Sequence, residues 1–258
     1  MVKAGTIAAR LHDALSSRSI GSEITDVRIG LGYVGVRLDS AKVGIAAVLR
    51  NELPPGCTTI HRAGTLTGRR ALELLTYLVT GRTALDRAIG LATANALIEK
   101  STENEKDTLK LLCLSDRDHV AMVGMFRPLI KKIRSTGAEL SIIERDPAQM
   151  NVAGEEAKKN ILQKCTVAII TATAIVTNTM EEILASLGCP RHVVVLGPST
   201  PMCSAVFEDT AVTHLGGSVV MDGDKILQVI SEGGGTPAMR PHLKFVTILT
   251  AQGTRGIR

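Results

Sequence analysis

The second half of the chain alternates short apolar runs with amphipathic segments, and this alternation restricts the possible folds strongly. The apolar runs lie at 119–124, 139–144, 165–171, 192–197 and 213–220. Segments with helical spacing lie between the first four runs, at 128–136, 153–164 and 179–187. Nearly continuous apolar runs are typical of strands buried on both faces, and strand–helix alternation makes neighbouring strands parallel. Residues 108–258 are therefore predicted to form a Rossmann-like parallel sheet with helices on both faces and right-handed crossovers.

The first half has a different pattern, in which strands follow one another directly. Gly and Asp separate three short runs that indicate a strand meander, at 24–29, 30–38 and 42–49, and a turn follows at 54–56. Helical spacing is found at 4–19, 69–79 and 83–99. Thr83 is placed to cap the last of these helices. This half is predicted to be a small α+β domain.

The most polar stretch of the chain, residues 99–107 (EKSTENEKD), separates the two patterns. Polar, charged stretches between patterned segments are typical of linkers. The expected division is therefore an N-terminal domain over 1–107, with its linker near 99–107, and a Rossmann-like domain over 108–258.

The composition excludes several classes of partner. The chain has two Tyr, three Phe and no Trp, which weighs against single-stranded nucleic-acid binding by base stacking and against an interfacial aromatic belt. The net charge of +5 is spread along the chain and favours anionic small molecules over a DNA track. We expect a small-molecule ligand, no nucleic acid and no membrane. Ala-rich helices and edge strands would permit a homodimer.

Cysteine and histidine spacing gives no metal or disulfide motif. The five cysteines are an odd number with no CxxC, which favours a reducing cytoplasm. The N-terminus has no apolar signal-peptide core. The six histidines are scattered without HxxxH or HExxH, so no preformed transition-metal site is predicted. Cys189 and His192 lie three apart, but structural roles explain them better.

Ligands of parallel sheets bind beyond the carboxyl ends of the strands, so the loops after the strands are the candidate site. In the first loop, Gly124 permits close backbone approach and Pro128 suits a first helical turn. The helix start and Arg127 would attract an anion. The G-x-G-x-x-G motif is absent, which weighs against classical NAD or FAD binding.

Glu144 ends the second predicted strand, 20 positions after Gly124. Dinucleotide-binding proteins hold ribose hydroxyls with an acid at about this distance. A solvated glutamate at the end of a strand is an equally good explanation. Glu144 is therefore a candidate on which a nucleotide-binding alternative depends.

Three later loops are also polar. Residues 171–179 include Thr171 and Asn178 and end at Thr179, a predicted cap for a helix beginning at Met180. Local capping explains these side chains as well as a ligand does. The loop 197–201 (GPSTP) suits an oxyanion or a rigid turn. Residues 233–236 (GGGT) lack the lysine of a P-loop and are expected to form a flexible turn.

In order and spacing, several segments resemble the "putative heavy-metal chelation" family of largely uncharacterised bacterial and archaeal proteins. They are GLGYVGVRLDSAKVGIA, AIGLATANAL, VAMVGMFRPLI, LSIIERDP, TVAIITATAIVTNTMEEIL and VVVLGPSTPM. The resemblance implies an enolase-N-terminal-like α+β domain followed by a Rossmann-like domain. It places a ligand-binding cleft between them at Asn95, Gly124, Phe126, Arg127, Glu144, Thr171, Asn178, Gly197, Pro198 and Ser199. Ala172 stands where a glycine is expected, and its methyl group would narrow the pocket.

Two functions stay open at this point. The first is binding of a small anionic cofactor, metallophore or metal chelate in the cleft, in heavy-metal or anaerobic cofactor metabolism, with any metal arriving already chelated. The alternative is a transferase or oxidoreductase that uses a nucleotide-type cofactor. The candidate ligands are a metal chelate, a pterin-like or tetrapyrrole-like molecule, or a nucleotide. Catalytic residues are not assigned. Phe126 and Tyr33 are the aromatic contact candidates, with core packing as the simpler explanation.

Overall fold

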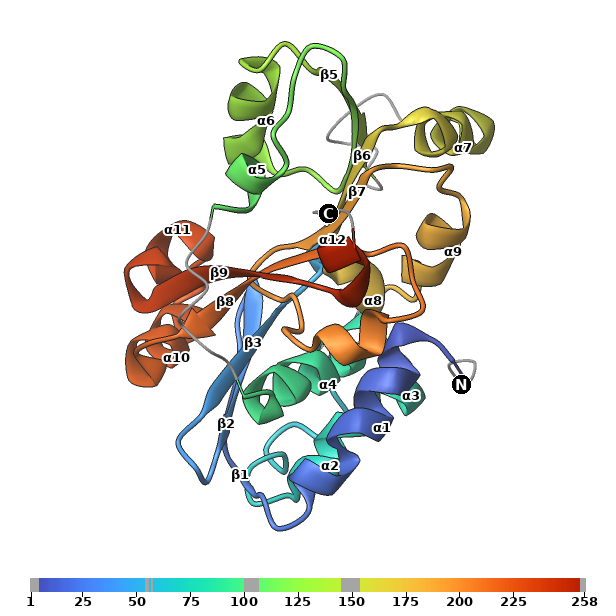
Figure 1. The fold of residues 1–258 in the computed structure, drawn as a ribbon. Coiled ribbons are helices and arrows are strands. Elements are labelled where there is room, and N and C mark those ends of the chain that lie inside the picture. Colours follow the sequence, from blue (N-terminus) through green and yellow to red (C-terminus); the bar gives the residue numbers. More distant parts are fainter. Residues whose placement is uncertain (1–4, 54–55, 57, 100–106, 145–153, 256–258) are drawn as a thin grey trace.

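The computed structural model describes residues 5–53, 56, 58–99, 107–144 and 154–255. The strands of these residues form two sheets (Figure 1). The smaller sheet is antiparallel and consists of β1 (Ile24–Ile29), β2 (Tyr33–Leu38) and β3 (Val43–Ala47). The larger sheet has six strands in the order β5-β4-β6-β7-β8-β9. This mixed α/β architecture is consistent with the predicted pair of domains, the second of them Rossmann-like.

Five strands of the larger sheet are parallel and one is not. The strands are β4 (His119–Val123), β5 (Glu139–Ile143), β6 (Val167–Thr171), β7 (His192–Leu196), β8 (His214–Val220) and β9 (Leu243–Leu249). β9 pairs antiparallel with β8, with His214 opposite Leu249. The five strands predicted from the sequence are parallel, and the antiparallel edge strand β9 was not predicted. After β8, helix α10 packs on β1 and β2 rather than crossing back over the large sheet, so the chain enters β9 from the end where β8 finishes.

The helices follow the predicted segments, with several additions. They are α1 (Ile7–Ser19), α2 (Ala71–Leu75), α3 (Tyr77–Thr80), α4 (Ala84–Leu97), α5 (Thr108–Leu111), α6 (Arg127–Arg134), α7 (Glu155–Lys164), α8 (Thr173–Val176), α9 (Met180–Ala185), α10 (Gly223–Ser231), α11 (Thr236–Met239) and α12 (Ala251–Arg255). Short 3-10 helices η1, η2 and η3 cover Arg50–Glu52, Ser204–Phe207 and Arg240–His242. The segment 69–79 is split into α2 and α3. The predicted flexible turn at 233–236 instead leads directly into α11.

Two predicted caps have different outcomes. Thr83 forms a capping box, because its hydroxyl accepts from the Asp86 N–H at 3.0 Å and the Asp86 carboxylate accepts from the Thr83 N–H at 3.0 Å. Thr179 occupies the N-cap position of α9 without a side-chain cap bond. Its hydroxyl instead bonds the Thr177 hydroxyl at 2.8 Å. The expected cap by Thr179 is therefore wrong, because a neighbouring side chain competes for the hydroxyl.

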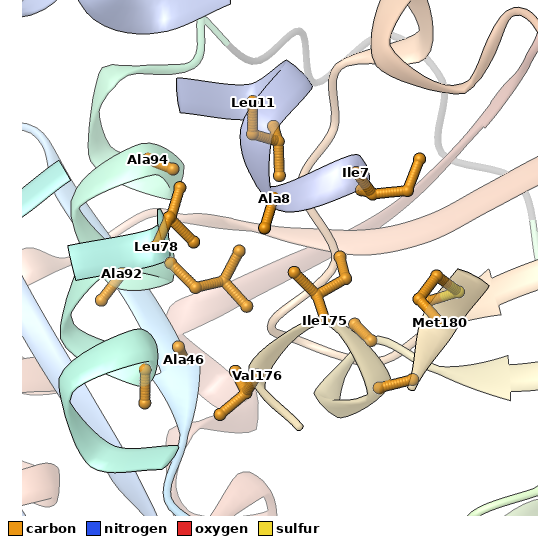
Figure 2. Close-up of a cluster of buried hydrophobic side chains, with 14 of the residues drawn as sticks. Ile7, Ala8, Leu11, Ala46, Leu78, Ala92, Ala94, Ile175, Val176 and Met180 are labelled. Carbon is orange, nitrogen blue, oxygen red and sulfur yellow. The ribbon is translucent and has the colours of Figure 1, made fainter. Parts of the chain in front are cut away.

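Helix α4 packs so closely against β3 that no side chain fits at Gly44. A Cβ atom on Gly44 would lie 2.1 Å from the Ala92 carbonyl oxygen and 2.2 Å from the Ala96 nitrogen. The small side chains of α4 at this contact explain why an alanine-rich helix occurs here. Figure 2 shows the adjoining core, in which Ala46, Ala92 and Leu78 belong to the same buried cluster as Ile175 and Met180 of the second half.

The other face of the small sheet is covered by a helix from the second half of the chain. Ile226, Leu227 and Ile230 of α10 pack with Tyr33 and Ile45 in one buried cluster. The three-stranded sheet therefore lies between α4 and α10, and the packing of the two halves is continuous. The proposed boundary itself is not described over 100–106, and neither are residues 54 and 55 of the predicted turn. Within the described ranges, no helix has the length and hydropathy needed to cross a bilayer.

Candidate functional site

The order of the large sheet places a switch point between β4 and β6. β5 lies on one side of β4 and β6 on the other, so the chain reverses its direction of travel across the sheet. Ligands of open α/β sheets bind in the crevice at this point. The loops after β4 and β6 touch there, because a Cβ on Gly124 would lie 2.8 Å from Cγ2 of Thr171. Gly124 has φ +84°, a conformation that favours glycine.

A cavity of about 1120 Å³ lies beyond the carboxyl ends of the central strands. It is lined by residues from the loops after β4, β6 and β7, from β8, from β9 and from α5. Tyr33 of β2 and Ala47 of β3 complete the lining. Both sheets therefore contribute to one cavity, at the switch point and along the neighbouring strands.

The cavity brings together part of the predicted site. The predicted residues that line it are Phe126, Arg127, Thr171, Gly197, Pro198 and Ser199. The predicted residues outside its lining are Asn95, Gly124, Glu144 and Asn178. Ala172 also lines the cavity, with its methyl group buried. The roles of all these residues toward a ligand stay predictions.

Two of the residues outside the lining support loops through hydrogen bonds. Asn95 is 2% exposed, and its amide nitrogen donates to the Ile45 carbonyl at 3.0 Å and to the Ser199 carbonyl at 2.9 Å. Glu144 accepts a hydrogen bond from the Met125 N–H at 2.9 Å. Both side chains thus hold backbone atoms of segments that line the cavity.

The other two residues outside the lining have backbone roles. Gly124 lies close to the Thr171 side chain, as described above, and its N–H donates to the Ile143 carbonyl at 2.9 Å. Asn178 is exposed and has φ +56° in the turn between α8 and α9. Asparagine tolerates this left-handed conformation better than most residues. Neither residue belongs to the cavity lining.

The loop after β7 is held firmly on several sides. Ser199 is buried, and its hydroxyl oxygen accepts from the Ala47 N–H at 2.8 Å. The Ser218 hydroxyl donates to the Pro198 carbonyl at 3.2 Å, and the Gly197 N–H donates to the Gly216 carbonyl at 3.0 Å. A loop fixed by β3, α4 and β8 presents its atoms to the cavity in one arrangement.

The charges around the cavity are mainly positive. Arg127 and Lys132 from α6, Arg240 at the start of η3 and Lys244 from β9 line it. Among the described lining residues, Asp107 is the one carboxylate, and it accepts from the Leu109 N–H at 3.0 Å as the N-cap of α5. These side chains therefore favour a negatively charged ligand.

Aromatic side chains concentrate at the cavity. The chain has only two tyrosines and three phenylalanines, and Tyr33, Phe126 and Phe245 all line this one cavity. The Arg240 guanidinium lies 5.2 Å from the centroid of the Phe245 ring. The Tyr33 hydroxyl bonds the Thr236 hydroxyl at 2.7 Å, and burial raises the pKa of Tyr33.

Sequence reasoning missed the contribution of the last strand region. Lys132, Arg240, Lys244 and Phe245 were not candidates, and Thr236 was assigned to a flexible turn. The one available signal was the GGGT segment, which precedes α11 and carries Thr236 into the cavity. Nothing in local spacing connects these residues with the loops after β4 and β7.

Histidines gather away from the cavity. The His192 and His214 rings meet edge to face with centroids 5.0 Å apart, at the amino ends of β7 and β8. Burial, with a smaller effect of His192, lowers the pKa of His214 to about 4. In the described part of the chain, no group of three or more His, Cys, Asp or Glu side chains is placed to hold a metal ion.

Comparison with known proteins shows the family to which this chain belongs. Two sequence profiles, both described as "putative heavy-metal chelation", match residues 12–98 and 107–249. The chain therefore belongs to this family.

Individual relatives give the same result. An uncharacterised protein of Methanocaldococcus jannaschii is 22% identical over 231 residues, which cover 86% of this chain and 88% of the relative. A crystal structure of a family member of unknown function from Pyrococcus horikoshii matches with a TM-score of 0.81 and 19% identity, covering 95% of this chain and 100% of the other. A member from Desulfitobacterium hafniense matches with a TM-score of 0.75 and 19% identity, covering 93% and 99%. These structures are similar in fold.

Proposed function

We propose that this protein binds a small anionic ligand, namely a cofactor, metallophore or metal chelate, in the cavity between the two sheets. The observation that carries the proposal is the charge of the cavity. Arg127, Lys132 and Arg240 are exposed at its wall, above apolar residues such as Leu196. Basic groups at the mouth of an apolar pocket are suited to a ligand with an anionic group and an apolar body.

The size of the cavity supports an organic ligand rather than a bare ion. Ligand pockets are commonly about 300–1000 Å³, and this cavity has about 1120 Å³. Among the described residues that line it there is one carboxylate and no histidine or cysteine. A heavy metal, the subject of the family description, would accordingly enter this cavity as a chelate whose organic part supplies the metal ligands.

No observation favours the nucleotide-dependent enzyme as a second function. That alternative rested on Glu144 as a ribose-binding acid. In the structure Glu144 accepts a hydrogen bond from the Met125 N–H and does not line the cavity. The division into domains 1–107 and 108–258, the enolase-like character of the first and the cytoplasmic location stay predictions.

The test is native mass spectrometry of freshly purified protein, followed by calorimetric titration with ferric citrate, a pterin and a porphyrin. We expect a retained ligand or saturable binding of one probe. Arg127→Gln removes one charge-assisted contact and should weaken that binding about tenfold or more.

The matched control is Arg18→Gln, a change at an exposed arginine of α1. It should leave affinity unchanged. Because Arg127 is exposed as well, neither variant should lower the thermal midpoint of unfolding. Absence of any retained molecule together with absence of saturable binding would reject the proposal.

A further inference from the structure

We infer that the ligand of this cavity is an elongated dianion, with an anionic group at each end of an apolar, ring-sized body. The inference rests on the proposed function and adds the shape and charge distribution of the ligand. It follows from the positions of Arg127 and Arg240 near opposite edges of the large sheet, and from the residues that line the cavity between them.

The first basic end belongs to α6. Arg127 is the first residue of this helix, directly after Phe126, and Lys132 follows on the same helix. Helix α6 packs against β5, at one edge of the six-stranded sheet. No ion pair of Arg127 is found with another described residue.

The second basic end belongs to the opposite edge of the sheet. Arg240 begins η3, immediately before β9, which is the last strand in the sheet order. Its guanidinium lies 5.2 Å from the Phe245 ring centroid, a contact that restrains it by cation–π attraction. Lys244 of β9 lines the same end of the cavity.

Each basic end contains an aromatic ring, and the strand that Phe126 reaches lies two strands from the one that carries Phe245. The Phe126 ring reaches the loop after β7, because a Cβ on Gly197 would lie 3.8 Å from its Cε1 atom. Phe245 is on β9, two strands beyond β7 in the sheet order. Adjacent strands lie about 4.8 Å apart, so the backbones of β7 and β9 are roughly 10 Å apart across the sheet.

The surface between the two ends is largely apolar, with hydroxyl groups such as that of Thr108 beside it. Ile169, Val194 and Leu196 of β6 and β7 belong to one cluster on this face of the sheet and line the cavity. Gly216 of β8, which has no side chain, continues the lining toward β9. A ligand with one anionic group would contact Arg127 or Arg240 but not both. A dianion with an apolar middle matches both ends and the surface between them.

The test uses three rigid probes and calorimetric titration of the full-length protein. Biphenyl-4,4′-dicarboxylate carries its two carboxylates at the far ends of an apolar body. Biphenyl-4-carboxylate has the same body with one carboxylate, and biphenyl-2,2′-dicarboxylate has the same charge as the first probe with its carboxylates close together. The 2,2′ isomer therefore separates the effect of geometry from that of total charge.

We expect the 4,4′ isomer to bind more tightly than both other probes. Arg127→Gln and Arg240→Gln should each weaken its binding about tenfold, and the double variant about 100-fold. The monocarboxylate and the 2,2′ isomer should respond to only one of the two substitutions. Arg18→Gln is the control and should change none of the affinities.

Three results would overturn the inference. They are equal affinity of the two dicarboxylates, insensitivity of the 4,4′ isomer to either arginine, and no binding of any biphenyl probe. The proposed function is judged separately, by the retained ligand and by the Arg127 variant with ferric citrate, a pterin or a porphyrin. A monoanionic ligand that depends on Arg127 alone would leave the proposed function standing and reject the dianion.

Discussion

The side-chain amide of Asn95 donates a hydrogen bond to the main-chain carbonyl of Ser199 across 2.9 Å. The same nitrogen donates to the Ile45 carbonyl at 3.0 Å. One buried side chain of α4 thereby joins β3 to the loop after β7, which lines the cavity. The relationship links the stability of the first half of the chain to the geometry of the binding site.

Asn95→Ala should therefore destabilise the protein and weaken ligand binding together. Two buried carbonyl groups lose a donor, and we expect a loss of about 2 kcal/mol in the free energy of unfolding. Urea denaturation measures this loss. Gln228→Ala, at an exposed amide of α10, is the control and should change stability by less than about 0.5 kcal/mol. An equally small effect of Asn95→Ala would show that the loop is held by its other contacts.

Gly44→Ala should disrupt the packing of α4 on β3. The new methyl group would lie 2.1 Å from the Ala92 carbonyl oxygen and 2.2 Å from the Ala96 nitrogen. Backbone atoms of a buried helix cannot move away cheaply, so we expect a loss of at least about 2 kcal/mol. Gly32→Ala is the control, since the nearest atom to its Cβ is 3.6 Å away. Thermal unfolding of both variants checks the prediction, and similar midpoints would contradict it.

Asp118→Asn should cost about 3 kcal/mol of stability, because this buried carboxylate accepts several charge-assisted bonds. Its oxygens accept from Arg191 Nε at 3.1 Å, Arg191 Nη2 at 2.9 Å, the Thr166 hydroxyl at 2.9 Å and the Ser115 N–H at 2.9 Å. These bonds hold the pKa of Asp118 well below its usual range, despite the opposing effect of burial. Urea denaturation measures the loss.

The matched control for Asp118 is Asp224→Asn. Asp224 is paired with Arg37, but its side chain is 85% exposed. Exposed ion pairs contribute about 0–1 kcal/mol, so this variant should be nearly as stable as the unmodified chain. Equal losses of stability in the two variants would mean that burial of Asp118 does not strengthen its ion pair with Arg191.

Acid should destabilise the protein in a window set by His214. Burial and the neighbouring His192 lower the pKa of His214 from 6.5 to about 4. The unfolded chain therefore binds a proton that the folded chain does not, and stability falls as the pH decreases from about 6.5 to about 4. The loss at the lower end is on the order of 3 kcal/mol. Protonation of Asp118 destabilises the protein further at pH values below 3.8, the pKa of this carboxyl in the unfolded chain.

Unfolding free energies measured between pH 4 and pH 7 check this window. His214→Gln should flatten the pH dependence, because the group that protonates on unfolding is removed. His61→Gln, at an exposed histidine, should leave the slope unchanged. An unaltered slope in the His214 variant would assign the acid sensitivity to other groups.

The local pattern was sufficient to predict the five parallel strands, because strands buried on both faces must be apolar at nearly every position. Val167 to Ile170 show this, since alternate residues pack on opposite faces of the sheet. The pattern also indicated that the loops after Val123, Thr171 and Leu196 hold the site, and Phe126, Arg127 and Ser199 do line the cavity. The rule used there depends only on strand direction.

Sequence alone determined the alternation of elements and the mild positive charge, and it predicted the loops at which a ligand would bind. Tertiary structure decided which side chains reach the cavity. Asn95 and Glu144 are turned to backbone partners, while Arg240 and Phe245 are brought to the site by pairing of β9 with β8. Local periodicity records the burial of each residue along its own element. It carries no information on contacts between segments that are far apart in the sequence, because the free energy of such contacts depends on how whole elements pack.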